Sequence, residues 1–412
     1  MSINFDVKNN INFGARIAAI PEAKGIKSTN VKVADLKLKG LTAFIGGDVF
    51  ESSGKIAKHD LLFLDKKLIA IDEFNPEVFQ MQLPVNCVCM TGKTVAPSII
   101  DQHTHVILGD HNSLTEDGIR SSLRQLKAEG TGAIVATLLP DSIANIRNQI
   151  KILNKVLSSQ NEDEAKLLGI HLEGPFLSPL KPGIHNKNGL ILPTIENFLA
   201  MEPENVRIVT LAPEMDKDYA LSKYLMAHGI IPSAGHTVAT AEDIQKSGIK
   251  NITHIFNAMA PLHHRTPTVA NEALFNPDIA VEMIAENSHI IPQVKDLIMR
   301  EKPADKIILI SDTVSLVGKK KSFVMGGKRI YIDENWIARD KAGTLAGSVR
   351  CLHDLAKELI QSTKMTFKDF INYACVNPAK NLGLENKFAV RIGESADITV
   401  WNNAAIKPEK VL

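Results

Sequence analysis

Residues 132–173 read GAIVATLLPDSIANIRNQIKILNKVLSSQNEDEAKLLGIHLE, and this stretch decides the fold class. It begins with an apolar run over 132–139 and ends with another over 167–173, each of a length typical of a buried strand. Between them, over 142–157, apolar residues recur every three or four positions, which indicates an amphipathic helix. A strand, a helix and a second strand in this order predict a βαβ unit with parallel strands.

The same alternation extends in both directions along the chain. Apolar runs of strand length lie at 95–101, 132–139, 167–173, 206–212, 230–234, 250–254, 279–285 and 306–311. Helical patterns follow most of them, as in GIRSSLRQLKAEG at 118–130, where a glycine can end the helix. Eight parallel strands with returning helices is the count of a (β/α)8 barrel, although counting alone also allows an open doubly wound sheet.

Strand-like sequences of another kind flank this core at both ends. From Leu41 onward, short β-like runs alternate with turn residues, and the run SADITVW at 395–401 has the same character. We therefore predict an α/β protein in which a (β/α)8 barrel over 93–384 carries a small β-sandwich domain. That domain is formed from both chain ends, 41–92 with 385–412, and residues 1–40 are an N-terminal extension of unknown role.

Composition excludes several classes of protein. With 44% hydrophobic and 23% charged residues, the chain has the composition of an ordinary soluble globular protein. Because 47 Lys and Arg nearly balance 46 Asp and Glu, no general positive field attracts nucleic acid or an anionic membrane. No apolar stretch approaches the roughly 18 residues of a membrane span. Four cysteines are too few for a disulfide framework, and we expect a cytoplasmic protein.

Two histidines follow the first barrel strand and are candidate metal ligands. In IIDQHTHV, His103 and His105 are two residues apart, so on a strand both side chains face the same side. Neutral imidazole is a common metal ligand. For an isolated pair, two solvated loop histidines are an equally good interpretation, and the ends of the other strands must decide.

Further polar residues follow the ends of later strands. They are Glu173 after the third strand, His236 after the fifth, His254 at the tip of the sixth and Asp312 after the eighth. The carboxyl ends of barrel strands meet at one face, which is where barrels hold their active sites. Several imidazoles with a carboxylate suit Zn²⁺ or Fe²⁺, and such an ion lowers the pKa of bound water. We therefore predict a metal hydrolase with Asp312 as the acid and base.

At this point the sequence resembles a known family, the N-acetylglucosamine-6-phosphate deacetylases of the amidohydrolase superfamily. The resemblance runs from about Leu41 to Trp401. It rests on the motifs IIDQHTH, HLEGPFLSP with KPGIHN, SAGHT, THIFNAMAPLHHR, ISDT and GTLAGS. It implies hydrolysis of the acetamide of N-acetylglucosamine 6-phosphate to glucosamine 6-phosphate and acetate, in amino-sugar catabolism.

The resemblance also implies roles for individual residues. It implies one or two divalent ions per subunit, zinc or iron, with the first held by Glu173, His236 and His254. Where a second ion is bound, His103 and His105 would hold it, and Asp312 would act as acid and base. Contacts to the phosphosugar substrate would come from Ile184, His185, Asn257, Ala258, His289, Leu345, Ala346 and Gly347. His264 and Arg265 resemble a pair that reaches the phosphate from a neighbouring subunit, which implies a homodimer.

Three other functions compete with this interpretation. A deacetylase of the galactosamine epimer would share the same motifs. Another amidohydrolase acting on a small amide would use a carboxylated lysine on strand four, and VRIVTLAPE at 206–214 contains none. A non-catalytic barrel scaffold would be expected to lack metal ligands, whereas here each expected position is filled.

Overall fold

The structure is a computed structural model that describes residues 41–64, 67–72, 86–108, 114–315, 321–391 and 397–412. The predicted N-terminal extension, residues 1–40, lies outside the described residues. The chain divides into two compact units. One ends at Ser98 and resumes at Leu384, and the other spans Ile99–Gly383. The predicted fold class, an eight-stranded barrel with a small β domain from both chain ends, is confirmed.

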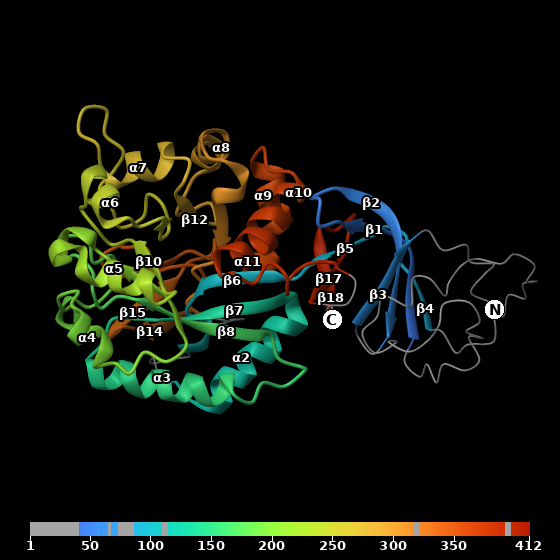
Figure 1. The fold of residues 1–412 in the computed structure, drawn as a ribbon, viewed down its shortest axis with the longest axis horizontal. Coiled ribbons are helices and arrows are strands. Elements are labelled where there is room, and N and C mark those ends of the chain that lie inside the picture. Colours follow the sequence, from blue (N-terminus) through green and yellow to red (C-terminus); the bar gives the residue numbers. More distant parts are fainter. Residues whose placement is uncertain (1–40, 65–66, 73–85, 109–113, 316–320, 392–396) are drawn as a thin grey trace, which may run out of the picture. The chain divides into compact units, whose positions relative to one another are not determined.

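The small unit is a seven-stranded sheet with strands from both ends of the chain (Figure 1). Its strands are β1 Leu41–Phe50, β2 Ile56–Leu64, β3 Lys67–Asp72, β4 Asn86–Cys89, β5 Lys93–Pro97, β17 Ile398–Asn402 and β18 Lys407–Val411. The order is β18-β17-β5-β1-β2-β3, and β4 also pairs with β1. The C-terminal strand β17 runs antiparallel to β5, with Val400 opposite Val95. The prediction that this C-terminal run completes the sheet is confirmed for Ile398–Trp401, whereas residues 395 and 396 lie outside the described residues.

Apolar side chains of the small sheet form a core of their own. Phe44 on β1 lies 5.0 Å from Phe63 on β2, measured between ring centroids, and both are buried. Val95 and Val400 pack into the same cluster from β5 and β17. Strands that are distant in sequence thus bury one shared apolar surface, which explains why neither end forms the domain alone.

The second unit is a barrel of parallel strands. Its strands are β6 Ile99–Thr104, β7 Thr131–Leu138, β8 Lys166–Glu173, β9 Val206–Leu211, β10 Ile231–Ala234, β11 Asn251–Ile252, β12 Ala280–Ile284 and β13 Ile307–Ile310. Neighbours in sequence are neighbours in the sheet. Burial on both faces explains the nearly continuous apolar runs that predict these strands, since β7 is buried at all eight positions.

The predicted first strand, 95–101, is divided between the two units. Residues up to Pro97 belong to β5 of the small sheet, and β6 of the barrel begins at Ile99. Ser98 separates them and donates its backbone N–H to Asp397 O at 3.0 Å. A continuous apolar pattern cannot reveal such a change of sheet, because both strands are buried.

The barrel closes where its first and last strands end. Asp312 N donates to His103 O at 3.0 Å, and His105 N donates to Thr313 O at 2.8 Å. Below them, Asp101 accepts hydrogen bonds from the backbone N–H and the hydroxyl of Ser311. This seam brings the residues that follow β6 and β13 to one place.

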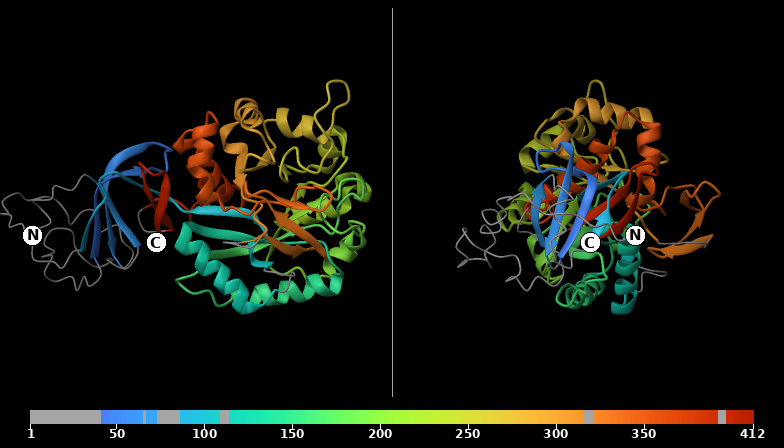
Figure 2. Two further views of the ribbon diagram at one scale, coloured as in Figure 1. Left: turned by 180° about the vertical axis from the view of Figure 1, so that it is seen from behind. Right: turned by 90° about the vertical axis from the view of Figure 1, so that its right-hand side faces the viewer.

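Helices cover the outside of the barrel. They are α2 Glu116–Glu129, α3 Ile143–Leu157, α4 Ile195–Leu199, α5 Ala220–Ala227, α6 Ala241–Ser247, α7 Val269–Phe275, α8 Pro292–Glu301, α9 Leu352–Ser362, α10 Phe367–Ile371 and α11 Asn377–Asn381. Helices α2 to α8 lie between the barrel strands in sequence, and α9 to α11 follow the last strand. Helices α2 and α3 lie side by side against β7 and β8 (Figure 2). Of the helices described, none combines the length and the apolar character needed to cross a membrane.

Side-chain caps define where the helices begin. Thr115 accepts a hydrogen bond from Gly118 N at the start of α2, and Ser142 accepts one from Asn145 N at the start of α3.

A further insertion follows β13. It comprises β14 Ser322–Met325, β15 Lys328–Ile332 and β16 Ala338–Asp340 in one antiparallel sheet, with a hairpin turn at Gly326 and Gly327.

Candidate active site

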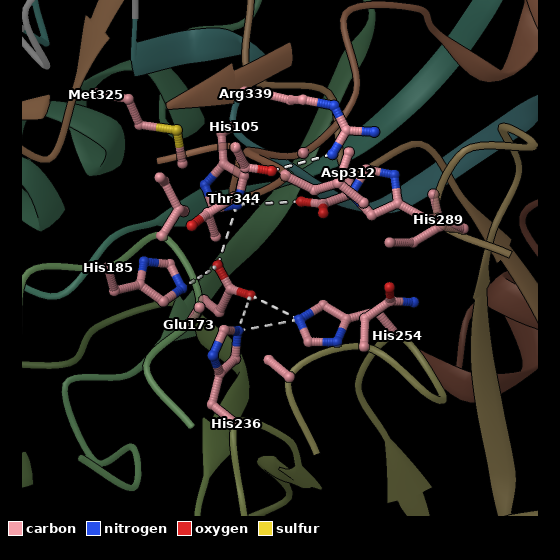
Figure 3. A pocket seen from close by; sticks show the side chains of 18 residues that line it. His105, Glu173, His185, His236, His254, His289, Asp312, Met325, Arg339 and Thr344 are labelled. Carbon is pink, nitrogen blue, oxygen red and sulfur yellow. Dashed lines mark hydrogen bonds and ion pairs between the residues drawn. The ribbon is translucent and has the colours of Figure 1, made fainter. Parts of the chain in front are cut away.

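The carboxylate of Glu173 lies at the centre of a buried cluster of histidines (Figure 3). Its Oε1 atom lies 3.0 Å from His254 Nε2 and 3.2 Å from His236 Nε2. Its Oε2 atom lies 3.1 Å from His105 Nε2 and 3.2 Å from His185 Nε2. Four segments that are far apart in sequence therefore direct ring nitrogens at one carboxylate.

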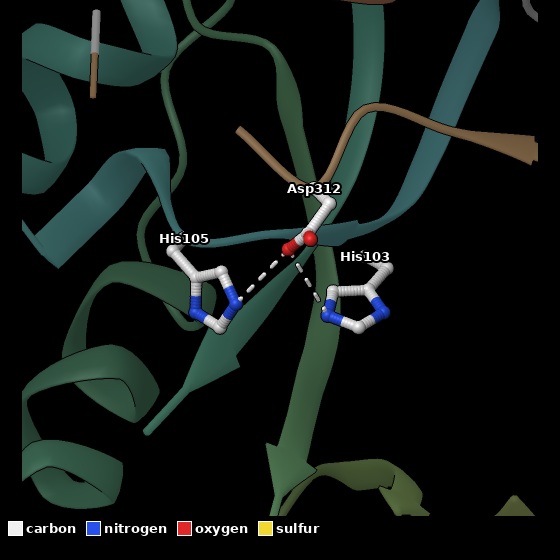
Figure 4. Close-up of side chains that lie close together, drawn as sticks. All are labelled: His103, His105 and Asp312. Carbon is white, nitrogen blue, oxygen red and sulfur yellow. Dashed lines mark ion pairs between the residues drawn. The ribbon is translucent and has the colours of Figure 1, made fainter. Parts of the chain in front are cut away.

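Asp312 lies beside this cluster, against the two histidines of the first strand (Figure 4). Its Oδ1 atom lies 3.4 Å from His105 Nε2 and 3.6 Å from His103 Nε2. His103 Nε2 also lies 3.4 Å from Glu173 Oε1. The donors thus form two adjoining groups, one around Asp312 and one around Glu173, with the Glu173 carboxylate facing both.

The outer ring nitrogens determine which form the histidines take. His236 Nδ1 lies 2.9 Å from Lys181 O, and His105 Nδ1 lies 3.2 Å from Thr137 O. A carbonyl oxygen can only accept, so in each ring Nδ1 carries the hydrogen. In a neutral imidazole this leaves a lone pair on Nε2, the atom that faces Glu173. Metal-binding histidines are oriented in the same way by an outer acceptor.

The donor set fits a divalent metal ion. In each of two groups, His103 with His105 and Asp312, and Glu173 with His185 and His236, the candidate ligand atoms lie within 4.8 Å of one another. His103 Nε2 is buried and has no hydrogen-bond partner in the described part of the chain. A buried nitrogen without a partner costs about 1–3 kcal/mol, and a bound cation would satisfy it.

Several site residues have a strained backbone. His236, His254 and Asp312 have φ angles of 48°, 28° and 51°, in the left-handed region that residues with a side chain rarely adopt. Each such residue costs on the order of 1 kcal/mol or more, and persists only where the surrounding structure imposes it. The clustering of this strain at the ends of β10, β11 and β13 marks a functional site.

Burial and neighbouring charges both shift pKa values in this cluster. Burial opposes ionisation of Glu173, but the surrounding histidines, His185 and His103 first, outweigh it and hold the pKa of this carboxyl well below its usual value. Burial likewise opposes a charge on His103, but Glu173 and Glu282 outweigh it and raise the pKa of this imidazole well above its usual value. The Glu173 carboxylate is therefore charged, and a divalent ion bound beside it would be stabilised by this charge.

A cavity of about 350 Å³ opens above these groups, and most of the predicted site residues line it. They are His105, Glu173, Ile184, His185, His236, His254, Asn257, Ala258, His289, Asp312, Leu345 and Gly347. His103 lies beneath the cavity and is fully buried, as is Ala346. His264 and Arg265 do not line it, because they lie on an exposed loop after β11.

Comparison with known proteins agrees with this geometry. The sequence pattern of the amidohydrolase family matches residues 94–411. The chain belongs to the amidohydrolase family.

Within this family the chain is similar to N-acetylglucosamine-6-phosphate deacetylases, as its motifs predict. The Bacillus subtilis (strain 168) enzyme of that name is 32% identical over 335 residues, which cover 78% of this chain and 82% of the relative. The Homo sapiens enzyme is 30% identical over 383 residues, covering 87% and 88%. The predicted resemblance is confirmed.

Solved structures of the same name share the amidohydrolase fold of this chain. A mutant of the deacetylase from Mycobacterium smegmatis, in complex with N-acetyl-D-glucosamine-6-phosphate, superposes with a TM-score of 0.80 at 25% identity. That match covers 91% of this chain and 98% of the other. The deacetylase from Pasteurella multocida gives a TM-score of 0.80 at 22% identity, covering 89% and 97%.

Sequence reasoning missed two residues of this amidohydrolase site. Glu282 on β12 is fully buried, and its Oε2 atom lies 3.1 Å from His103 Nδ1. A signal was present, since an acidic residue in the middle of the apolar run IAVEMIA needs a buried partner. Arg339 on β16 lines the cavity with its side chain half-buried. The sequence gives no comparable signal for Arg339, because its segment has the pattern of an ordinary polar hairpin.

Proposed function

We propose that this chain hydrolyses the acetamide of N-acetylglucosamine 6-phosphate, giving glucosamine 6-phosphate and acetate. One observation carries the proposal: four imidazole nitrogens converge on the buried Glu173 carboxylate at the carboxyl ends of the barrel strands, with Asp312 beside them. The names of the similar proteins, and the phosphosugar bound in the Mycobacterium smegmatis structure, support this substrate.

The proposed cofactor is one or two divalent ions per subunit, with zinc or iron favoured by the imidazole-rich donor set. Glu173, His236 and His254 would hold one ion, and His103 and His105 a second. When bound, such an ion lowers the pKa of a water molecule and polarises the amide carbonyl.

Asp312 is the proposed acid and base. Burial raises its pKa, but the hydrogen bond with His105 and the charge of His103 outweigh burial and lower it, so the group begins as a carboxylate. It accepts a proton from the attacking water, whose oxygen bonds to the carbonyl carbon. It then donates that proton to the sugar nitrogen as the carbon–nitrogen bond breaks, which releases acetate and the amine. His185 lines the same cavity and can stabilise the negative carbonyl oxygen.

The remaining cavity residues are proposed to bind the sugar. Ile184, Asn257, Ala258, His289, Leu345 and Gly347 line the space above Glu173 and Asp312, and Ala346 lies buried between two of them. His289 is oriented by a short hydrogen bond between its Nδ1 atom and Glu286, which leaves Nε2 available to the substrate.

Two arginines are candidates for the phosphate. Arg265 lies exposed on its loop and does not line the cavity of its own chain, which is consistent with a contact to the active site of a second subunit. In the described part of the chain, Arg339 is the one lysine or arginine that lines this cavity, and its Nη1 atom donates to Gly343 O at 3.0 Å. A guanidinium fork suits phosphate oxygens in either case.

Kinetics of the two alanine variants separate these arginines. Arg265→Ala is expected to raise KM for the 6-phosphate substrate, because a charged hydrogen bond worth about 1.5–3 kcal/mol of binding free energy is lost. The KM for the unphosphorylated sugar should change little. Arg339→Ala serves as the comparison. If the phosphate-specific loss appears in Arg339→Ala alone, the phosphate is bound within one subunit and the role proposed for Arg265 is wrong.

A homodimer in the cytoplasm is part of the proposal. The support for a second subunit is the exposed position of His264 and Arg265 outside the cavity of their own chain. Cys351 and Cys375 are buried free thiols, as expected in a reducing compartment.

The rival functions have less support in this site. In β9, the strand from which a bridging lysine would come, Thr210 faces the cluster and its hydroxyl lies 2.7 Å from His171 Nε2. A scaffold would not need a complete set of buried metal donors. The galactosamine epimer has no such argument against it, because the two sugars differ only in the orientation of one hydroxyl group.

A substrate panel tests the proposed function. Purified protein, supplied with zinc or ferrous iron, would be incubated with N-acetylglucosamine 6-phosphate, its galacto epimer and unphosphorylated N-acetylglucosamine, and kcat/KM for acetate release measured. We expect the gluco 6-phosphate to give the highest value. A higher value for the galacto epimer would reassign the substrate, and no acetate from any of the three would overturn the proposal.

A further inference from the structure

Glu282 lies outside the predicted ligand set but contacts it directly. It is on β12, inside the barrel, and is fully buried. Its Oε2 atom lies 3.1 Å from His103 Nδ1, and the same oxygen lies 3.4 Å from the backbone N–H of His254. One carboxylate thus contacts a residue from each of the two proposed metal-binding groups.

The other oxygen of this carboxylate is also occupied. Oε1 accepts a hydrogen bond of 2.7 Å from Gln102 Nε2, and Gln102 Oε1 in turn accepts one of 3.0 Å from Asn381 Nδ2. Both oxygens of the Glu282 carboxylate therefore have hydrogen-bond partners, and only Oε2 contacts His103. In the described part of the chain, its one ion-pair partner is His103.

This geometry determines which nitrogen of a neutral His103 ring carries the hydrogen. A carboxylate can only accept, so the hydrogen of a neutral His103 ring resides on Nδ1 and the lone pair on Nε2. That Nε2 atom points toward Glu173 and Asp312, and it is buried without a hydrogen-bond partner among the described residues. A carboxylate behind an imidazole also strengthens it as a donor.

We infer that Glu282 is a positioning residue that holds His103 as a ligand for the second metal ion. The inference rests on the proposed function, whose first ion is held by Glu173, His236 and His254. A cation bound at His103 Nε2 would also stabilise the buried Glu282 carboxylate behind the ring.

Metal binding by Glu282→Gln tests the inference without relying on activity. Glutamine keeps the size of the side chain but removes its charge, so the barrel should remain folded. Zinc affinity would be measured by calorimetric titration of metal-free protein, and bound zinc by elemental analysis. We expect two zinc sites in the native chain, and in Glu282→Gln one site weakened about 10- to 100-fold with the other unchanged.

Two further variants separate positioning from packing. Gln102→Leu removes the other partner of the same carboxylate but leaves the contact with His103, so both zinc sites should keep their affinity within a few-fold. His103→Gln removes the ligand itself and should weaken the same site as Glu282→Gln. Should Glu282→Gln fail to fold, Glu282→Asp, which retracts the carboxylate from His103, replaces it with the same expectation.

Three outcomes would overturn the inference. They are native affinity at both sites in Glu282→Gln, equal weakening in Gln102→Leu, and a native chain that binds a single zinc ion. The substrate panel is an independent measurement. In one outcome, the native chain releases no acetate in that panel while its Glu282→Gln variant loses the second zinc site. That outcome would contradict the proposed function and support the role of Glu282.

Discussion

Asp312 is the residue on which the proposed chemistry depends most. Its carboxylate is buried within 3.4 Å of His105 Nε2 and yet lines the cavity, so it can exchange a proton with a bound reactant. Its backbone φ of 51° directs it there, and Gly347 must approach closely for this to occur. A Cβ atom added at Gly347 would lie 2.6 Å from Asp312 O.

Replacing Asp312 by asparagine tests this role. Asparagine keeps the shape but cannot take up a proton, so we expect kcat to fall by at least about 10²- to 10⁴-fold. The ion held by the Glu173 group should remain, as measured by elemental analysis. Asp305→Asn, at an exposed carboxylate paired with Lys380, is the control and should keep native kcat. Near-native turnover in Asp312→Asn would contradict the assignment.

At this scale the sequence predicts the residues that end strands better than those within them. Glu173, His236, His254 and Asp312 stand out because polar side chains follow apolar runs. The contact of Glu282 with His103 joins residues 179 positions apart, and no local pattern encodes that distance. Arg339 enters the cavity only because the β14–β16 insertion folds over it.

Among the secondary-structure elements, helix α2 is joined to the turn before β8 by a buried ion pair between Arg120 and Glu164. Glu164 in that turn accepts hydrogen bonds from Arg120 at 3.1 Å and from Asn161 N at 2.9 Å. Burial raises the pKa of Glu164, but Asn161 and Arg120 outweigh it and lower the pKa below its ordinary value of 4.5. The folded state therefore favours the charged form, and this stabilisation is present above that pH and lost as the pH falls below it.

Glu164→Gln should remove this stabilisation. We expect the free energy of unfolding at neutral pH to fall by about 1–3 kcal/mol, since charged hydrogen bonds are lost. Denaturant titrations should show the difference from the native protein shrinking below about pH 4.5. Glu116→Gln, at an exposed carboxylate that pairs with the same Arg120 at 3.1 Å, should cost no more than about 0.5 kcal/mol. Equal losses in both variants would refute the buried-pair argument.

The strands are the elements that the sequence predicts most completely. All eight predicted barrel strands exist, because each is an apolar run buried on both faces. The exception at 95–101 arises because Ser98 divides two buried strands of different sheets. Helices of five residues, such as α4 and α10, are too short for periodicity to indicate.

At the scale of the whole molecule, we propose that each active site of a dimer includes Arg265 from the second subunit. Mixing Arg265→Ala chains with Asp312→Asn chains should restore activity, because one site of each mixed dimer has an intact Asp312 and the partner's intact Arg265. The recovered activity should approach one working site per mixed dimer. If verified mixed dimers show no recovery, Arg265 does not act across an interface.

The small β domain illustrates what sequence reasoning could establish at this scale. The run at 395–401 resembles the runs near the start of the chain, and strand β17 joins their sheet as that similarity predicts, beside β5. The pairing partner itself could not be predicted, because several runs of this sheet have similar apolar sequences. Strands β5 and β17, for example, are each buried at four of five positions, so no alternation of buried and exposed residues sets their register.

We propose that this barrel is a metal-dependent deacetylase of a phosphosugar. Acetate release from N-acetylglucosamine 6-phosphate, followed before and after removal of bound metal by a chelator, tests it most directly. We expect turnover by the metal-loaded protein, its loss on chelation, and its recovery when zinc or ferrous iron is restored. Turnover that persists in protein shown by elemental analysis to hold no metal would contradict the claim, as would metal-loaded protein that releases no acetate.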